Sequence, residues 1–180
     1  MTEMNADAVA AVFGDQAAAD RALQKLFAAG FKAADLSFVG KACHDQERVL
    51  GLIDHGRGAK FWGVRGVLWN RLWTHFGGGL FLTTPTTGPA FVLGQISFVA
   101  GETLDAALII GGMSAVGTAL YSIGISRDDA QRFEDAVCQD HFLLLVHGNA
   151  LDLAVENLRS SEPKYMSIYH RLARRMDLAA

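Results

Sequence analysis

The first forty residues combine short apolar runs with one helical repeat. Residues 9–15 form an apolar run that ends in Gly and Asp, which is typical of a strand followed by a turn. The next segment, QAAADRALQKLFAAGF, has apolar residues at helical spacing, with Asp15 placed to cap its start and Gly30 to end it. Residues 34–41 then alternate apolar positions with the polar Ser37. This pattern predicts a strand–helix–strand unit.

The last third of the chain carries the same signals in another order. Ser126, with Asp129 three residues later, is a variant of the capping box and precedes a helical apolar face. Residues 141–148 are a continuous apolar run of strand length, and Asn149 is placed to cap a further helix. We therefore expect a helix–strand–helix unit here.

These two units predict an α+β fold, in the form of a ferredoxin-like sandwich of split βαβ halves. Residues 1–56 supply the first half, with a further strand expected within 48–56, and residues 126–162 supply the second half. Residues 57–125 lie between them and are rich in Gly and Ala. We expect this insertion to be an apolar helical hairpin.

The insertion is apolar enough to raise the question of a membrane. Residues 72–101 contain no Asp, Glu, Lys or Arg, and residues 106–126 form a second uncharged stretch. A membrane-spanning helix needs about 20 mostly apolar residues. Residues 106–125 just reach that length, but TTPTTGP interrupts the preceding apolar stretch and leaves only residues 90–100, which are too few to cross. We favour a buried hairpin, with membrane insertion or a re-entrant loop as the alternative.

Two features of the insertion are candidate interaction surfaces. A stripe of small residues at every fourth position lets helix backbones approach closely. The segment KFWGVRGVLWNRLWTHF places aromatic residues near one helical face and adds basic residues without any acid, which is typical of a helix in a membrane interface. We favour the other interpretation, an amphipathic helix packed on the sheet or on another subunit. The candidates are Trp62, Trp69, Trp73 and Phe76 on the aromatic face, and Ala107, Gly111, Ala115 and Ala119 in the stripe.

After Pro163 the chain continues as KYMSIYHRLARRMDLAA, with apolar residues at helical spacing and arginines mostly elsewhere. Residues 163–180 are therefore predicted to form an amphipathic C-terminal helix that covers the domain. The alternative is that this helix docks on a neighbouring subunit or an acidic surface.

Composition narrows the classes of function and compartment. The chain has 180 residues, is 51% hydrophobic and 19% charged, and carries a net charge of −3. These values give no reason to expect a nucleic-acid partner. The two cysteines share no close motif, and the first residues lack the basic and apolar stretches of a signal peptide. We expect a cytoplasmic protein, with membrane association as the alternative.

Metal and catalytic signals are weak. Cys138 with His141, and Cys43 with His44, are weak candidates for a metal site because thiolates and imidazoles are the ligands of structural zinc. The commoner interpretation is that Cys138 is a small buried hydrophobe and that His141 and His147 lie on the surface at the two ends of a strand. The sequence has no nucleophile elbow, P-loop or dinucleotide fingerprint. We expect no cofactor.

Three stretches together resemble the heat-induced general stress protein domain, a bacterial family. They are VFGDQAAADRALQKLFAAGFKAADLSFVGK, TTPTTGPAFVLGQI and ALYSIGISRDDAQRFEDAVCQDHFLLLVHG, and the resemblance covers roughly residues 9–148. In that family a strand–helix–strand opening leads into a Gly- and Ala-rich insertion and then a closing apolar strand. The resemblance implies a stress-linked protein and transfers no catalytic residue.

Two short motifs carry the detail of this resemblance. The family's Pro-Gly-x-Gly-Pro-like turn is matched by Pro85, Gly88 and Pro89. Its Gly-Ile-Pro helix start is matched by Gly124 and Ile125, which are followed by Ser126 in place of proline. Serine is also a good helix starter.

From these features we expect a non-enzymatic, stress-associated homo-oligomer that acts through self-association or protein interaction, using its apolar helical insertion. One alternative is a peripheral membrane protein that binds anionic lipid through the Trp-rich basic helix and the hairpin. Another is a small-ligand binding protein or enzyme with a pocket between hairpin and sheet.

Overall fold

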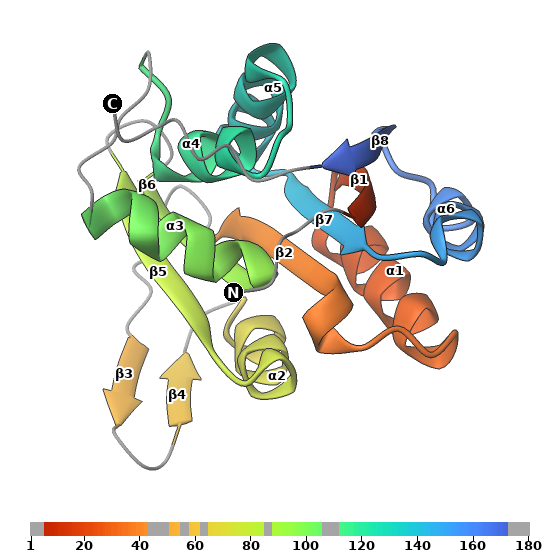
Figure 1. Cartoon of the computed structure of the whole chain (residues 1–180). Helices are drawn as coiled ribbons and strands as arrows, with labels where there is room; N and C mark the ends of the chain where they lie inside the picture. The colour runs from red at the N-terminus through yellow and green to blue at the C-terminus, as the bar shows by residue number, and fades with distance from the viewer. Residues whose placement is uncertain are drawn as a thin grey trace.

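The computed structural model describes residues 6–42, 51–54, 58–61, 65–84, 88–105 and 112–172. These residues form an α+β fold around a six-stranded antiparallel sheet with the order β5-β6-β2-β7-β1-β8 (Figure 1). A separate two-stranded sheet consists of β3 and β4. The strands are β1 (Ala6–Phe13), β2 (Leu36–Lys41), β3 (Gly51–Asp54), β4 (Gly58–Phe61), β5 (Gly79–Thr84), β6 (Gly88–Gly94), β7 (Phe142–His147) and β8 (Tyr165–Leu172).

Helices cover both faces of the large sheet (Figure 1). Helices α1, α2 and α6 pack on one face, and α3, α4 and α5 pack on the other. The core therefore has two apolar layers, one on each side of the sheet, and the central strands are buried on both faces. The helices within the described ranges are α1 (Gln16–Ala28), α2 (Gly66–Phe76), α3 (Gln95–Asp105), α4 (Ala115–Ser122), α5 (Arg127–Cys138) and α6 (Leu151–Arg159).

The predicted helix boundaries are confirmed at α1 and α5. Asp15 Oδ1 accepts the Ala18 N–H at 2.8 Å, and Gly30 follows the helix with a φ of 96°. Ser126 Oγ accepts the Asp129 N–H at 3.1 Å. The prediction for Asn149 is wrong, because α6 begins after Ala150 without a side-chain cap.

An aromatic cluster fills the layer under α1 and α2. The Trp69 ring lies 4.7 Å from Phe91 and 5.8 Å from Phe38, measured between ring centroids. Gly40 on β2 leaves room for this cluster, because a Cβ built there would lie 2.7 Å from a ring carbon of Phe142. The cluster fixes α2 against β6 and β2 by shape as well as by burial.

A bidentate ion pair holds the start of α2. Arg65 donates from Nη1 and Nη2 to the two carboxylate oxygens of Asp140, each at 2.7 Å. Its guanidinium also lies 4.9 Å from the centre of the Phe142 ring. Because Asp140 belongs to the turn between α5 and β7, this pair ties the insertion to the second half of the chain.

The expected helical hairpin is wrong in its first half, because residues 79–94 contain strands. β5 and β6 pair antiparallel in continuous register and extend the sheet beyond β2. The segments LFLTT and AFVL are rich in Phe, Val and Thr, which favour strands. Apolar runs this short carry no periodicity that separates strand from helix.

The second half of the expected hairpin also differs from the prediction. A continuous helix over residues 106–125 is excluded, because Gly112 has a φ of 83° and Ser114 is extended and caps α4. The carboxylate of the buried Glu134 on α5 accepts the Ser114 N–H at 3.0 and 3.1 Å. Gly117 makes room for that carboxylate, because a Cβ there would lie 2.3 Å from its Oε2.

The predicted C-terminal helix is wrong over residues 165–172, which form β8 beside β1. β8 sends Tyr165 and Tyr169 towards one core layer and Met166 towards the other. A strand that is apolar on both faces imitates the spacing of an amphipathic helix, which explains the misassignment.

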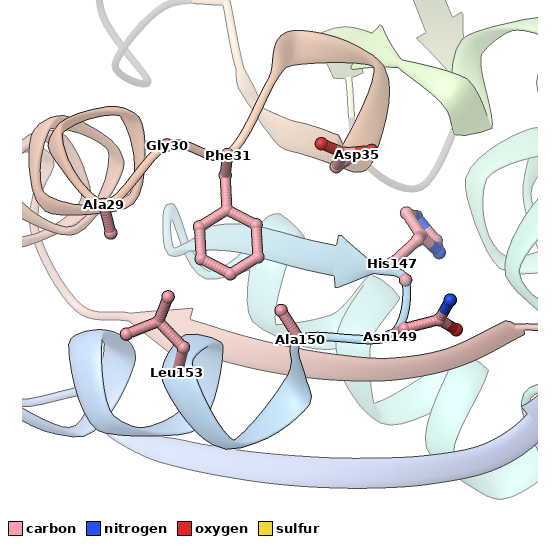
Figure 2. A pocket seen from close by; sticks show the side chains of 9 residues that line it. Ala29, Gly30, Phe31, Asp35, His147, Asn149, Ala150 and Leu153 are labelled. Atoms are coloured by element: carbon pink, nitrogen blue, oxygen red, sulfur yellow. The ribbon is translucent and has the colours of Figure 1, made fainter.

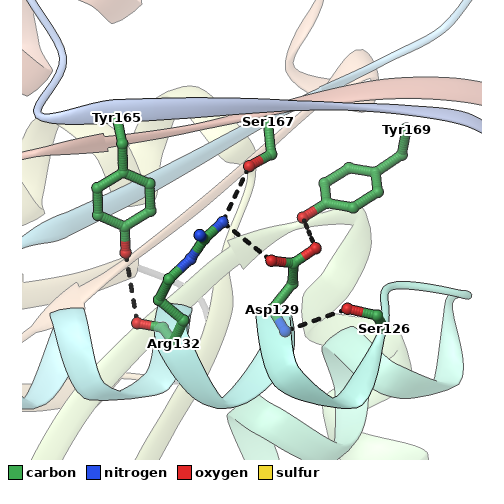
Figure 3. Close-up of polar contacts among 6 residues, drawn as sticks. All are labelled: Ser126, Asp129, Arg132, Tyr165, Ser167 and Tyr169. Carbon is green, nitrogen blue, oxygen red and sulfur yellow. Dashed lines mark hydrogen bonds and ion pairs between the residues drawn. The ribbon is translucent and has the colours of Figure 1, made fainter.

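Polar contacts from α5 anchor β8 (Figure 3). The Tyr169 hydroxyl donates to Asp129 Oδ2 at 2.9 Å, and Arg132 donates to Ser167 Oγ at 3.1 Å. Arg132 also forms an ion pair with Asp129 at 2.9 Å and lies 4.9 Å from the centre of the Tyr165 ring. Burial and the contact with Asp129 raise the pKa of Tyr169, so its hydroxyl stays protonated and remains a donor.

Candidate functional site

An open cleft of about 270 Å³ lies where α1 ends and α6 begins. Figure 2 shows the Phe31 ring pointing towards the first turn of α6, which carries Leu153. The polar side chains of Asp35, His147 and Asn149 also line the cleft. Its volume is near the lower end of the usual range for ligand pockets, roughly 300 to 1,000 Å³, so it has room only for a small ligand.

The least expected residue of this region is His147, which is only 6% exposed instead of lying on the surface. Its Nε2 lies 3.3 Å from Ser37 Oγ, and the same oxygen accepts the Ile96 N–H at 3.1 Å. Among the described residues its Nδ1 is buried without a hydrogen-bond partner. Burial lowers the pKa of His147 to about 4, and the charge of Asp35 partly opposes this shift.

The contact between Ser37 and His147 has the residue types of a nucleophile and its base, but its surroundings differ from an active site. Ser37 is fully buried, and the imidazole points away from the Phe31 ring in Figure 2. Nucleophilic catalysis needs a hydroxyl that substrate can reach. In this arrangement Ser37 joins β2, the end of β7 and the start of α3.

Sequence reasoning missed this contact for a physical reason. The alternation around Ser37 predicts one solvent-facing side of the strand, whereas helices cover both faces of β2. Ser37 and His147 are also 110 positions apart in sequence. Only the antiparallel pairing of β2 with β7 brings them together.

The described residues provide no metal site with three or more His, Cys, Asp or Glu ligands. Cys138 is partly buried, and burial together with the charge of Glu134 raises the pKa of its thiol. His141 Nε2 accepts from Lys164 Nζ at 3.1 Å, and burial and that ammonium lower its pKa. The other two candidates, Cys43 and His44, lie outside the described residues.

The aromatic face of α2 packs largely inside the protein. Trp69 is 1% exposed, and Trp73 and Phe76 are partly buried against the same core layer. The basic residues near this face contact acids of other elements, as Arg65 does with Asp140 and Arg71 does with Asp20 on α1. Trp62 lies outside the described residues.

The structure describes two of the four residues of the small-residue stripe. Ala115 and Ala119 are buried on α4 in the layer shared with α3 and α5. Ala107 and Gly111 lie outside the described residues. The described half of the stripe is therefore used for packing within the chain.

Several large apolar side chains of the insertion remain exposed. Val67 on α2 is 79% exposed, Phe98 on α3 is 76% exposed, and Phe81 on β5 is 42% exposed. Helices α2 and α3 cover opposite faces of the sheet, so Val67 and Phe98 lie on its two sides. They belong to elements that adjoin the β5–β6 hairpin, since α3 contacts β5 and α2 contacts β6.

In the part of the chain that the structure describes, none of the helices combines the length and apolar character needed to cross a membrane. Comparisons with protein-family models, with curated proteins and with solved structures returned no match for this chain. The resemblance to the heat-induced general stress protein domain therefore stays a prediction.

Proposed function

We propose that this protein is a non-enzymatic, stress-associated protein that acts by self-association through its apolar insertion, residues 57–125. The observation that carries the proposal is that two phenylalanines of the insertion, Phe81 and Phe98, stand exposed in a stretch without a charged residue. Large apolar side chains that stay exposed near one sheet edge favour a protein contact at that edge.

Energetics favour covering these side chains. Full burial of one Phe side chain is worth about 1.5–3 kcal/mol relative to exposure. Residues 72–101 contain no Asp, Glu, Lys or Arg, so a contact there desolvates no formal charge from this stretch. A second copy of the chain presents the same uncharged surface.

The oligomeric state tests this proposal. Light-scattering chromatography of the whole chain over a wide concentration range is expected to give a discrete oligomer. Phe98→Ser is expected to shift that oligomer towards monomer, whereas Ile168→Ser, which alters an exposed apolar residue of β8, is expected to leave it unchanged. A monomer at every concentration would remove the proposal.

We propose further that β8, β1, β7 and β2 form the ferredoxin-like core that the resemblance implies. Helix α1 connects β1 to β2 across β7, and α6 connects β7 to β8 across β1, with both helices on one face. This pattern of connections supports a split βαβ arrangement extended by β6 and β5.

The link to stress rests on the resemblance alone. Quantifying the protein in its source cells before and after heating tests it directly. A rise in abundance is expected, and an unchanged amount across several stresses would contradict the link while leaving self-association untouched.

A further inference from the structure

We propose that two copies of the chain join by antiparallel pairing of β5 with its counterpart, in the register that places the two Phe81 residues opposite each other. This inference rests on the proposed self-association and names the strand and the register that bring it about. The contact would extend one sheet continuously through both copies.

β5 stands at one edge of the six-stranded sheet that the described residues form (Figure 1). The carbonyl of Pro89 on β6 accepts the Ala42 N–H at 2.9 Å and therefore faces β2. In an antiparallel ladder the N–H and C=O of one residue point the same way, and the direction alternates along the strand. Since Thr83 is paired with Pro89, the backbone groups of Gly79, Phe81 and Thr83 point away from β6.

The two edges of the sheet differ in how they are protected. β8 carries His170 and Arg171, its pairing with β1 shifts register between Ala6 and Ala8, and Arg171 has a φ of 55°. Charges and irregularities of this kind discourage strand addition. β5, with the sequence GLFLTT, has no charge and pairs with β6 in unbroken register. It is the edge suited to accept another strand.

The absence of charge at this edge favours a second copy of the chain as the partner. In a two-fold contact each side chain near the axis meets its own copy, so any charge there would face an identical charge. Residues 72–101 contain no Asp, Glu, Lys or Arg, which makes this edge compatible with itself. A partner chosen by charge would find no charged residue to recognise on β5.

The positions of the outward backbone groups determine the register. Pairing Phe81 with Phe81 of the second copy also pairs Gly79 with Thr83, so all three outward-facing residues find partners. This places one Phe81 ring directly opposite the other, and aromatic pairs of this kind stabilise antiparallel strands. A shift by two residues would leave one outward-facing residue of each copy unpaired.

Charge exchange at Phe81 tests the register. Phe81→Lys and Phe81→Glu are each expected to raise the dissociation constant of the dimer by roughly 100-fold or more, because like charges meet on the axis. An equimolar mixture of the two variants is expected to recover the dimer, which also shows that both variants fold. Ile168→Lys, on the other edge strand, is the matched control and is expected to leave the dimer intact.

Thr83→Pro is a second variant that adds no charge. It removes one outward-facing N–H while leaving the bonds to β6 in place, which an edge strand tolerates. It is expected to weaken the dimer. In the unmodified protein, amide hydrogen exchange at Gly79, Phe81 and Thr83 is expected to be slow in the dimer and fast in the Phe81→Lys monomer.

The outcomes separate this inference from the proposed function. An oligomer that persists in all three variants, with fast exchange at Gly79, Phe81 and Thr83, would overturn the β5 contact and leave self-association standing. Monomeric single variants that fail to associate when mixed would overturn the register centred on Phe81. An unmodified protein that is monomeric at every concentration would overturn both, and slow exchange of these amides in that monomer would place a segment of the same chain on β5.

Discussion

At some positions of this protein, the absence of a single side-chain carbon lets neighbouring elements pack closely. At Gly40 and Gly117 an added Cβ would collide with the Phe142 ring and with the Glu134 carboxylate. At His147 a titratable ring is enclosed at the end of β7. These positions lead to two predictions at the scale of the residue.

Gly40→Ala is expected to lower the free energy of unfolding by about 1–3 kcal/mol, the usual cost of overpacking a core. The new methyl group would lie 2.7 Å from a ring carbon of Phe142 and 3.3 Å from Trp69, and rigid rings cannot bend away. Urea denaturation followed by tryptophan fluorescence measures the change. Gly101→Ala, where an added Cβ meets nothing within 4 Å, is the control, and equal stability of the two variants would contradict the prediction.

The buried His147 makes stability depend on pH. Its pKa is about 4 in the folded state, below the ordinary value of 6.5, so between these values the unfolded chain binds a proton that the folded chain excludes. Stability is therefore expected to fall as the pH drops from 6.5 towards 4, by up to roughly 3 kcal/mol. His147→Gln is expected to show a flatter dependence in urea titrations, whereas His170→Gln, at an exposed position, should keep the slope of the unmodified protein. Equal slopes for all three proteins would refute this account.

At the scale of elements, local signals predicted those boundaries that depend on one or two side chains. The caps by Asp15 and Ser126 are examples, because a cap is a contact between near neighbours. β5, β6 and β8 were predicted as helices, because their short apolar runs fit either period. β6 pairs with β2 and β8 pairs with β1, both far away in sequence, and β5 joins the sheet through β6.

The anchoring of β8 by α5 gives a prediction for an element. Tyr169→Phe removes the hydrogen bond to Asp129 and is expected to lower the free energy of unfolding by about 1.5–3 kcal/mol, since the acceptor is charged. Amide exchange along β8 should accelerate more than exchange along β7. Tyr165→Phe, which loses a longer bond to the Arg132 carbonyl, is the control with the smaller expected effect. The reverse order of the two variants would argue against this anchor.

At the scale of the whole molecule, the proposed self-association links stability to concentration. If the dimer forms only from folded copies, the midpoint of thermal unfolding is expected to rise with protein concentration. Phe81→Lys should abolish this dependence. Scanning calorimetry at several concentrations measures both, and a midpoint independent of concentration in the unmodified protein would speak against a folded dimer.

The sequence by itself determined the α+β class, the strand–helix–strand opening with its caps, and the uncharged character of residues 72–101. These features depend on near neighbours or on composition. Only the tertiary structure decided that residues 79–94 join the sheet along β2, that Ser37 meets His147, and that Trp69 lies in the core. The physical reason is common to all three. Strand pairing and burial depend on residues that are distant in sequence, so the local spacing of apolar and polar residues does not reveal them.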